Sequence, residues 1–269
     1  MSALHFSLRQ APAQRLDLAP LTPERLAGLS EAEIAKIELQ TTRQRVCVGD
    51  VFGLRMGDAA QVRIDGHERF DRIGCAMASG DLHVDGDAGI QAGRHMRGGR
   101  LTVTGNAGPW AGSGMKGGTL EIKGDAGERL GAPLAGEMAG MRGGVLIVRG
   151  NAGARAGDKL RRGMIVVEGN AGDHAGSRMI AGTLIVGGRA GALPGYLMAR
   201  GSIVLAGGHE ALAPTFADCG VHDLVASTLM AHYVQPHSAQ LGRRLRQPWR
   251  RLLGDMAAMG KGEIFCPPA

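Results

Sequence analysis

The stretch L-H-V-D-G-D-A-G-I-Q-A-G-R-H-M-R-G-G at residues 82–99 recurs, 19 residues later, as L-T-V-T-G-N-A-G-P-W-A-G-S-G-M-K-G-G at 101–118. The G-[D/N]-A-G tetrad within it begins at Gly86, Gly105, Gly124, Gly150 and Gly169, and weaker forms begin at Gly188 and Gly207. One interval is 26 residues rather than 19, and we place the seven-residue insertion at Ala132–Met138. A fixed period of this length is the signature of a repeat protein.

Each tetrad is preceded by a short run in which apolar residues alternate, such as Leu82-His83-Val84 and Leu101-Thr102-Val103. This alternation predicts a strand. Nineteen glycine-rich residues are too few for a strand, a helix and two turns, but they can form one coil. We therefore predict an all-β fold, a right-handed parallel β-helix that is a single-stranded solenoid with about 19 residues per coil. Equivalent residues would stack about 4.8 Å apart, with recurring glycines at left-handed corners.

The repeat divides the chain into three parts. Residues 1–60 lack it and are expected to form an N-terminal extension that caps the solenoid, with a helix beginning at Pro23 and another over 32–39 behind a Ser30 capping box. Residues 61–209 are expected to form the β-helix. Residues 210–269 are expected to form an irregular C-terminal extension, helical over 223–233, that packs on the solenoid or on partner subunits.

The middle residue of each strand should face outward, and in the later coils it becomes aliphatic. These residues are Ile147, Val166, Ile185 and Val204. A solvated sheet face does not need four stacked aliphatic side chains, so something covers them. Two covers are open, the C-terminal segment of this chain or another subunit, and the four residues are our candidate partner-facing column.

A second column is cationic and directly follows the recurring Met position. It contains Arg97, Lys116, Arg142 and Arg161. One reading is a solvated corner that keeps the solenoid soluble. The other is a stripe that binds an anion or an acidic partner.

Composition excludes several classes of protein. The 269 residues include 45 Gly but only 11 Pro, which excludes collagen, and four widely separated Cys, which form neither a disulfide framework nor a zinc knuckle. No apolar run is long enough to cross a membrane, so we expect a cytoplasmic protein. The net charge of +6 comes mostly from Arg and is not read as a nucleic-acid site. No spacing indicates a catalytic constellation or a metal site, and the recurring Asp/Asn position is interpreted as a ladder of turn residues.

The repeat G-[D/N]-A-G-x-x-x-G-x-x-M-x-G-G resembles the glycine-rich domain shared by the C subunit of formylmethanofuran dehydrogenase and the C-terminal part of the glutamate synthase large subunit. Two segments outside the repeat are also similar to that family, namely Gly49-Asp50-Val51-Phe52 and Gly254-Asp255 with Gly260–Ile264. The resemblance therefore covers most of the chain and favours a free-standing C subunit. The Arg-over-Lys, Ala/Gly-rich composition favours the bacterial formyltransferase/hydrolase complex over the archaeal molybdenum or tungsten dehydrogenase.

The resemblance implies a scaffold subunit of a cytoplasmic hetero-oligomer with no catalytic residue, metal or cofactor of its own. Such a complex moves a formyl group from formyl-tetrahydromethanopterin to a methanofuran-type carrier and releases formate. Catalysis and the metal would lie in an amidohydrolase-like and a formyltransferase subunit. Three alternatives stay open: the C subunit of the dehydrogenase, a carrier-binding subunit that uses the basic column, and a glutamate synthase-like domain that organises a tunnel.

Overall fold

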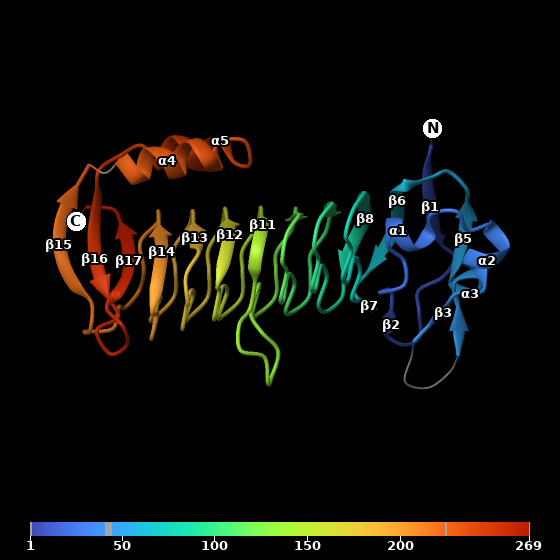
Figure 1. Ribbon diagram of the computed structural model, residues 1–269, viewed down its shortest axis with the longest axis horizontal. Helices are drawn as coiled ribbons and strands as arrows, with labels where there is room; N and C mark the ends of the chain where they lie inside the picture. Colours follow the sequence, from blue (N-terminus) through green and yellow to red (C-terminus); the bar gives the residue numbers. More distant parts are fainter. Residues whose placement is uncertain (1, 41–44, 224, 269) are drawn as a thin grey trace.

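The computed structural model describes residues 2–40, 45–223 and 225–268. Its main feature is one mixed, largely parallel sheet of 13 strands, in the order β15-β16-β17-β14-β13-β12-β11-β10-β9-β8-β6-β1-β5, beside two two-stranded sheets. The strands stand side by side along the long axis of the molecule (Figure 1). The sequence prediction of a mostly β fold is confirmed.

The central strands are parallel and pair in the register that the repeat predicts. Leu82 lies beside Leu101, Leu101 beside Leu120, and Leu120 beside Leu146. These strands are β6 (Asp58–His67), β8 (Asp81–Ala88), β9 (Arg100–Val103), β10 (Thr119–Ile122), β11 (Arg142–Val148), β12 (Arg162–Val167), β13 (Thr183–Val186) and β14 (Arg200–Leu205). A second line of parallel bridges joins the tetrad alanines from Ala88 to Ala190 and ends at His209. Each repeat therefore adds one step along the axis.

The interior of this stack is aliphatic and closely packed. The strand leucines and the recurring Met column, which includes Met77, Met96 and Met115, are buried. Two recurring glycine columns adopt the left-handed backbone that the sequence predicts, and Gly112 (φ +69°) is typical. A Cβ on Gly112 would overlap the Leu146 side chain, so packing as well as φ requires glycine there.

The seven-residue insertion lies where the spacing predicts. The Met141 N–H donates to the Gly131 carbonyl at 2.7 Å, as the Met115 N–H donates to Gly112 at 3.1 Å in an uninterrupted repeat. The coil therefore closes normally, and the extra residues form a loop that projects from the stack between β10 and β11 (Figure 1). Met138 in this loop is 80% exposed.

The N-terminal segment joins the main sheet. Strand β1 (Ala3–Leu8) pairs in parallel with β6 and antiparallel with β5 (Phe52–Arg55). The remaining elements are β2 (Leu16–Asp17), α1 (Pro23–Leu26), α2 (Glu31–Ala35), β3 (Glu38–Leu39), β4 (Val46–Cys47), α3 (Val48–Val51) and β7 (Phe70–Asp71). The helix at Pro23 and the Ser30 capping box are confirmed. The helix expected over 32–39 instead ends at Ala35, since Glu38 and Leu39 pair with β4.

The C-terminal segment is more regular than the sequence suggests. After β15 (Ala217–His222) come the helices α4 (Val225–Val234) and α5 (Ala239–Arg244), then β16 (Trp249–Gly254) and β17 (Lys261–Cys266). Helix α4 covers the predicted helical segment 223–233 from Val225 onward and extends one residue beyond it to Val234, and residue 224 is outside the described residues. Strand β17 adds a further parallel strand to β14, and β16 and β15 follow antiparallel.

Candidate functional site

The outward aliphatic column lies beneath the chain's own C-terminal segment. Ile147, Val166, Ile185 and Val204 are 2%, 0%, 0% and 1% exposed. The last three join a second buried cluster with residues of α4, α5, β16 and β17, including Ala231, Leu241, Trp249 and Phe265. We call α4, α5 and Trp249 the C-terminal cover. The expectation of a partner-facing column is corrected, because its side chains are already buried within this chain.

Arg149 links the sheet by hydrogen bonds to the turn between α4 and α5 in the C-terminal cover. Its guanidinium donates to Glu121 Oε1 at 2.6 Å, to Glu168 Oε1 at 2.7 Å and to the His237 carbonyl at 2.6 Å. Partial burial alone would lower the pKa of Arg149, but the hydrogen bonds to the two carboxylates raise it. Arg244 of α5 donates to the carbonyls of Gly187 and Ala206 at 2.8 and 2.9 Å. The cover is therefore held by charged hydrogen bonds as well as by apolar packing.

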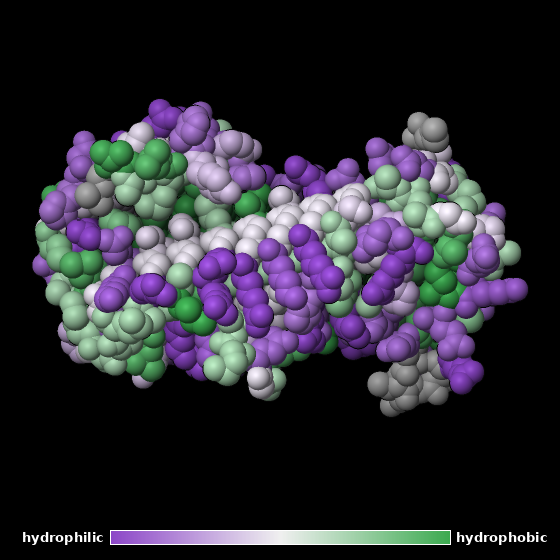
Figure 2. All heavy atoms as spheres, in the orientation of Figure 1, coloured by the Kyte–Doolittle hydropathy of each residue, from purple (hydrophilic) through white to green (hydrophobic). Residues whose placement is uncertain are grey.

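The cationic column forms a ladder on an uncovered part of the surface. The backbone N–H groups of Arg97, Lys116, Arg142 and Arg161 donate to the carbonyls of Met77, Met96, Met115 and Met141 at 2.6–2.9 Å, so the four residues occupy equivalent positions in successive coils. All four side chains are exposed. We call them the basic ladder. Figure 2 shows a row of extended hydrophilic side chains beside a pale band that crosses the coils.

Acidic groups near these coils are engaged elsewhere. Glu137 of the inserted loop pairs with Arg94 at 2.7 Å and lies 3.5 Å from His95 Nε2, and buried Asp158 pairs with Arg178. Burial alone would raise the pKa of Glu137, but the Leu134 N–H and Arg94 lower it. Within residues 2–40, 45–223 and 225–268, no ion pair involves the basic ladder.

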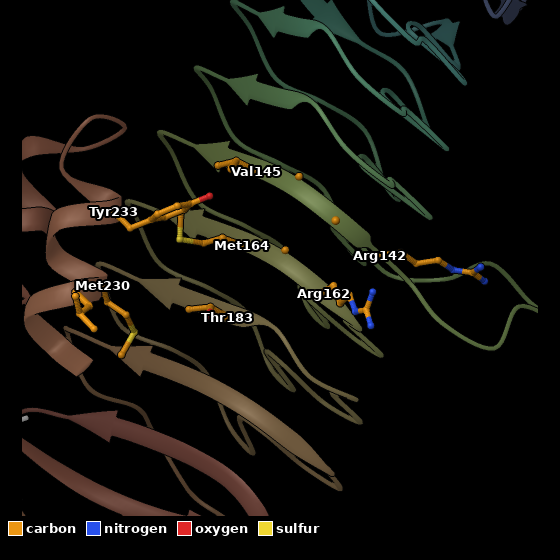
Figure 3. A pocket seen from close by; sticks show the side chains of 11 residues that line it. Arg142, Val145, Arg162, Met164, Thr183, Met230 and Tyr233 are labelled. Atoms are coloured by element: carbon orange, nitrogen blue, oxygen red, sulfur yellow. The ribbon is translucent and has the colours of Figure 1, made fainter. Parts of the chain in front are cut away.

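A groove of about 560 Å³ lies beside α4, and one residue of the ladder, Arg142, lines it. Arg142 and Arg162 lie at one side, and Met230 and Tyr233 of α4 at the other, with Val145, Met164 and Thr183 on the strands between (Figure 3). Gly143, Gly144 and Gly163 also line it. A Cβ on Gly163 would approach the Gly144 carbonyl to 2.7 Å, so coil stacking keeps this strip free of side chains.

Sequence reasoning missed this groove, because its apolar wall comes from a helix distant in the chain. Leu229 and Tyr233 are four residues apart in α4 and are 67% and 59% exposed. That spacing is the available signal for an apolar helix face. Sequence reasoning also missed the Arg94–His95–Glu137 contact, which the inserted loop brings together.

The described residues do not gather metal-binding side chains: among them, no three of His, Cys, Asp and Glu lie close enough to hold an ion. Cys47, Cys75, Cys219 and Cys266 are free thiols. No helix in the described ranges is long and apolar enough to cross a membrane. The geometry offers surfaces for binding, namely the basic ladder and the groove.

The fold defines a repeat protein whose parallel strands are stacked along one axis, with a row of exposed cations and a groove on its surface. The GXGXG motif family matches residues 48–224. A chain in the crystal structure of the formyltransferase/hydrolase complex (FhcABCD) from Methylorubrum extorquens, in complex with methylofuran, is 42% identical and superposes over 100% of both chains with a TM-score of 0.92.

The C subunit of the Fhc formyltransferase/hydrolase complex from the same organism is 44% identical over 83 residues, 30% of this chain and 31% of that relative. This sequence match thus spans about a third of the curated relative's length, whereas the structural match spans the whole chain. The chain belongs to the GXGXG motif family and, within it, to the C subunits of formyltransferase/hydrolase complexes.

Proposed function

We propose that this chain is the non-catalytic scaffold subunit of a formyltransferase/hydrolase complex in one-carbon metabolism. The observation that carries the proposal is the full-length structural match to a chain of the FhcABCD complex. The same match favours this complex over a molybdenum or tungsten dehydrogenase and over a glutamate synthase-like domain. A rigid stack with an uncovered basic ladder suits a subunit on which others assemble.

In this proposal the chemistry belongs to the other subunits. A formyltransferase subunit would move the formyl group from formyl-tetrahydromethanopterin to a methanofuran-type carrier. An amidohydrolase-like subunit with a bound metal would then hydrolyse it to formate. The methylofuran in the relative's complex supports the identity of the carrier class. We place the complex in the cytoplasm.

We further propose that the coils wind as a right-handed parallel β-helix over residues 61–209. Residues 1–60 would cap one end, and 210–269 would cover the other end and one face. The parallel register and the second line of alanine bridges support this arrangement. A crystal structure with hairpins over 61–209 would contradict it.

The test is co-purification of the tagged chain with its neighbours from the native host. We expect an amidohydrolase-like and a formyltransferase subunit in a complex of fixed stoichiometry. Recovery of the chain as a lone monomer under gentle conditions would count against the scaffold role.

A second candidate function is carrier binding by the basic ladder. The specific observation in its favour is that the exposed cations have no acidic partner among the described residues. Calorimetric titration of the isolated chain with the carrier distinguishes the two functions, because a pure scaffold should give no heat. Arg97→Glu combined with Arg142→Glu should abolish any such binding while leaving the fold intact.

A further inference from the structure

The basic ladder and the groove beside α4 meet at Arg142, which belongs to both. We infer that they form one docking surface for an acidic amphipathic helix of a partner subunit, lying along the axis of the stack. The inference rests on the proposed function, since it needs an assembled complex. It goes beyond that function because it names the surface and the chemistry of its occupant.

The charge balance calls for external carboxylates. Residues 91–200 hold 15 Arg and Lys against 7 Asp and Glu. Of these acids, Glu121 and Glu168 pair with Arg149, while Glu137 and Asp158 pair with Arg94 and Arg178. The remaining three acids, Asp125, Glu128 and Asp173, form no ion pair with the ladder among the described residues. A partner that supplies carboxylates to these exposed cations gains attraction and orientation.

The wall of the groove formed by α4 is apolar, although its exposed side chains are not the ones that pack against the sheet. Helix α4 buries Ser227, Ala231 and Val234 against the sheet. Its outer face carries Val225, Leu229 and Tyr233, which are 78%, 67% and 59% exposed, and of these Leu229 and Tyr233 line the groove. These three lie four residues apart and form one stripe. Apolar side chains of an occupant would remove this stripe from water, which favours an amphipathic partner over a purely acidic one.

The spacing of the ladder selects a helix over an extended segment. Adjacent coils lie about 4.8 Å apart. Carboxylates three or four residues apart on one helix face are about 5–6 Å apart, so flexible Arg and Lys side chains can follow them coil by coil. In an extended strand, residues on one face are about 6.6–6.8 Å apart. This spacing exceeds that of the coils, so the carboxylates would no longer lie opposite the ladder residues after two or three coils. An amphipathic helix set in a groove is a common recognition mode.

Zero-length cross-linking in the purified complex tests the inference. A carbodiimide joins a lysine amine only to a carboxylate in contact with it. Lys116 should link to a partner Asp or Glu. Arg142→Lys should add a link three or four residues further along the same partner segment, and Arg161→Lys should add one about seven residues from the Lys116 link, because it lies one coil further. Exposed Lys123, outside the ladder, is the internal control and should give no link to that segment.

Charge reversal gives the matching affinity test. Arg142→Glu should weaken partner binding about tenfold at 50 mM NaCl, because an attraction becomes a repulsion, and the difference should shrink at 500 mM NaCl. Arg189→Glu makes the same charge change at an exposed corner outside the ladder and should change binding less than twofold.

The outcomes separate the two proposals. If partner subunits do not co-purify with the unaltered chain, the proposed function fails and this inference fails with it. If the complex assembles but Lys116 gives no partner link, or links form at two-residue spacing or to a second copy of this chain, the inference alone is overturned.

Discussion

At the scale of single residues, each Asp or Asn of the tetrad column stabilises the stack through one side-chain oxygen that accepts a hydrogen bond. The Oδ1 atoms of Asp87, Asn106, Asp125 and Asn151 each accept from a backbone N–H of the next coil at 2.6–2.9 Å. Aspartate and asparagine share this acceptor, which explains why they alternate freely. The predicted structural ladder of Asp and Asn residues is therefore confirmed, but its hydrogen bonds join successive coils, and these residues do not adopt the left-handed backbone.

Replacing Asn106 tests this ladder. Asn106→Ala removes the acceptor of the Asp125 N–H and should lower the free energy of unfolding by about 1 kcal/mol. Asn106→Asp keeps the oxygen and should cost less. Urea unfolding of both variants measures the difference, and equal losses would contradict a role for the oxygen.

Two glycines with positive φ allow the energetic cost of backbone strain to be distinguished from the cost of a packing clash. Gly112 and Gly136 have φ of +69° and +85°, but a Cβ would overlap Leu146 at the first and meet nothing within 4 Å at the second. Gly136→Ala should cost about 1–2 kcal/mol for the left-handed backbone. Gly112→Ala should cost at least about 1 kcal/mol more, because the core must shift. Denaturant titration compares them, and similar costs would show that φ alone matters.

At the scale of elements, the inserted loop is an addition to a complete coil. Removing residues 132–138 would leave Gly131-Ala139-Gly140-Met141, the spacing of Gly112-Ser113-Gly114-Met115. The deletion should fold and unfold within about 1 kcal/mol of the parent, since the loss is mainly the partly exposed Arg94–Glu137 pair. Circular dichroism and thermal melting measure this. Loss of the folded state would mean that the loop helps to close its coil.

Asp255 joins the turn between β16 and β17 to the last coil. Its buried carboxylate accepts from the Leu197 and Ala257 N–H groups, both at 2.9 Å. Burial alone would raise the pKa of Asp255, but hydrogen bonds lower it. A lowered folded-state pKa means that the carboxylate stabilises the fold above about pH 4 and loses this effect as the pH falls through the folded-state value.

The stability gap between the parent and Asp255→Asn should therefore be constant above about pH 4 and narrow as the pH falls below that value. Urea unfolding at a series of pH values measures it. A gap that is constant over the whole series would contradict a role for the charge.

The repeat was predictable because every coil has the same short-range structural requirements, so the same residue types recur at a fixed spacing. Gly112 and Met115 recur at fixed spacing since every coil needs the same corner and the same interior filling. The cover was not predictable in this way. Trp249 and Leu241 share a buried cluster with Val166, although both are more than 70 residues away from it in the sequence. A regular repeat gives no information about such distant contacts. The groove beside α4 depends on the same distant placement.

At the scale of the whole molecule, the cover changes how a stack should unfold. In a repeat protein each coil contacts mainly its neighbours, so stability is nearly a sum of local terms. The cover adds contacts across several coils, because Met164, Val166, Ile185 and Val204 share one buried cluster with Trp249. We expect β12–β14 to open as one unit with the cover, while β8–β10, which lie outside this cluster, depend on their neighbours alone.

Trp249→Ala tests this coupling. Trp249 is 1% exposed, and replacing it should lower the free energy of unfolding of the elements packed around it by about 3–5 kcal/mol. Amide hydrogen exchange should accelerate in β12–β14, α4 and α5, and change little in β8 and β9. Uniform acceleration along the stack would mean that the chain unfolds as a single unit. Acceleration confined to α4 and α5 would mean that the cover adds nothing to the coils beneath it, and that the aliphatic column is stable without its cover.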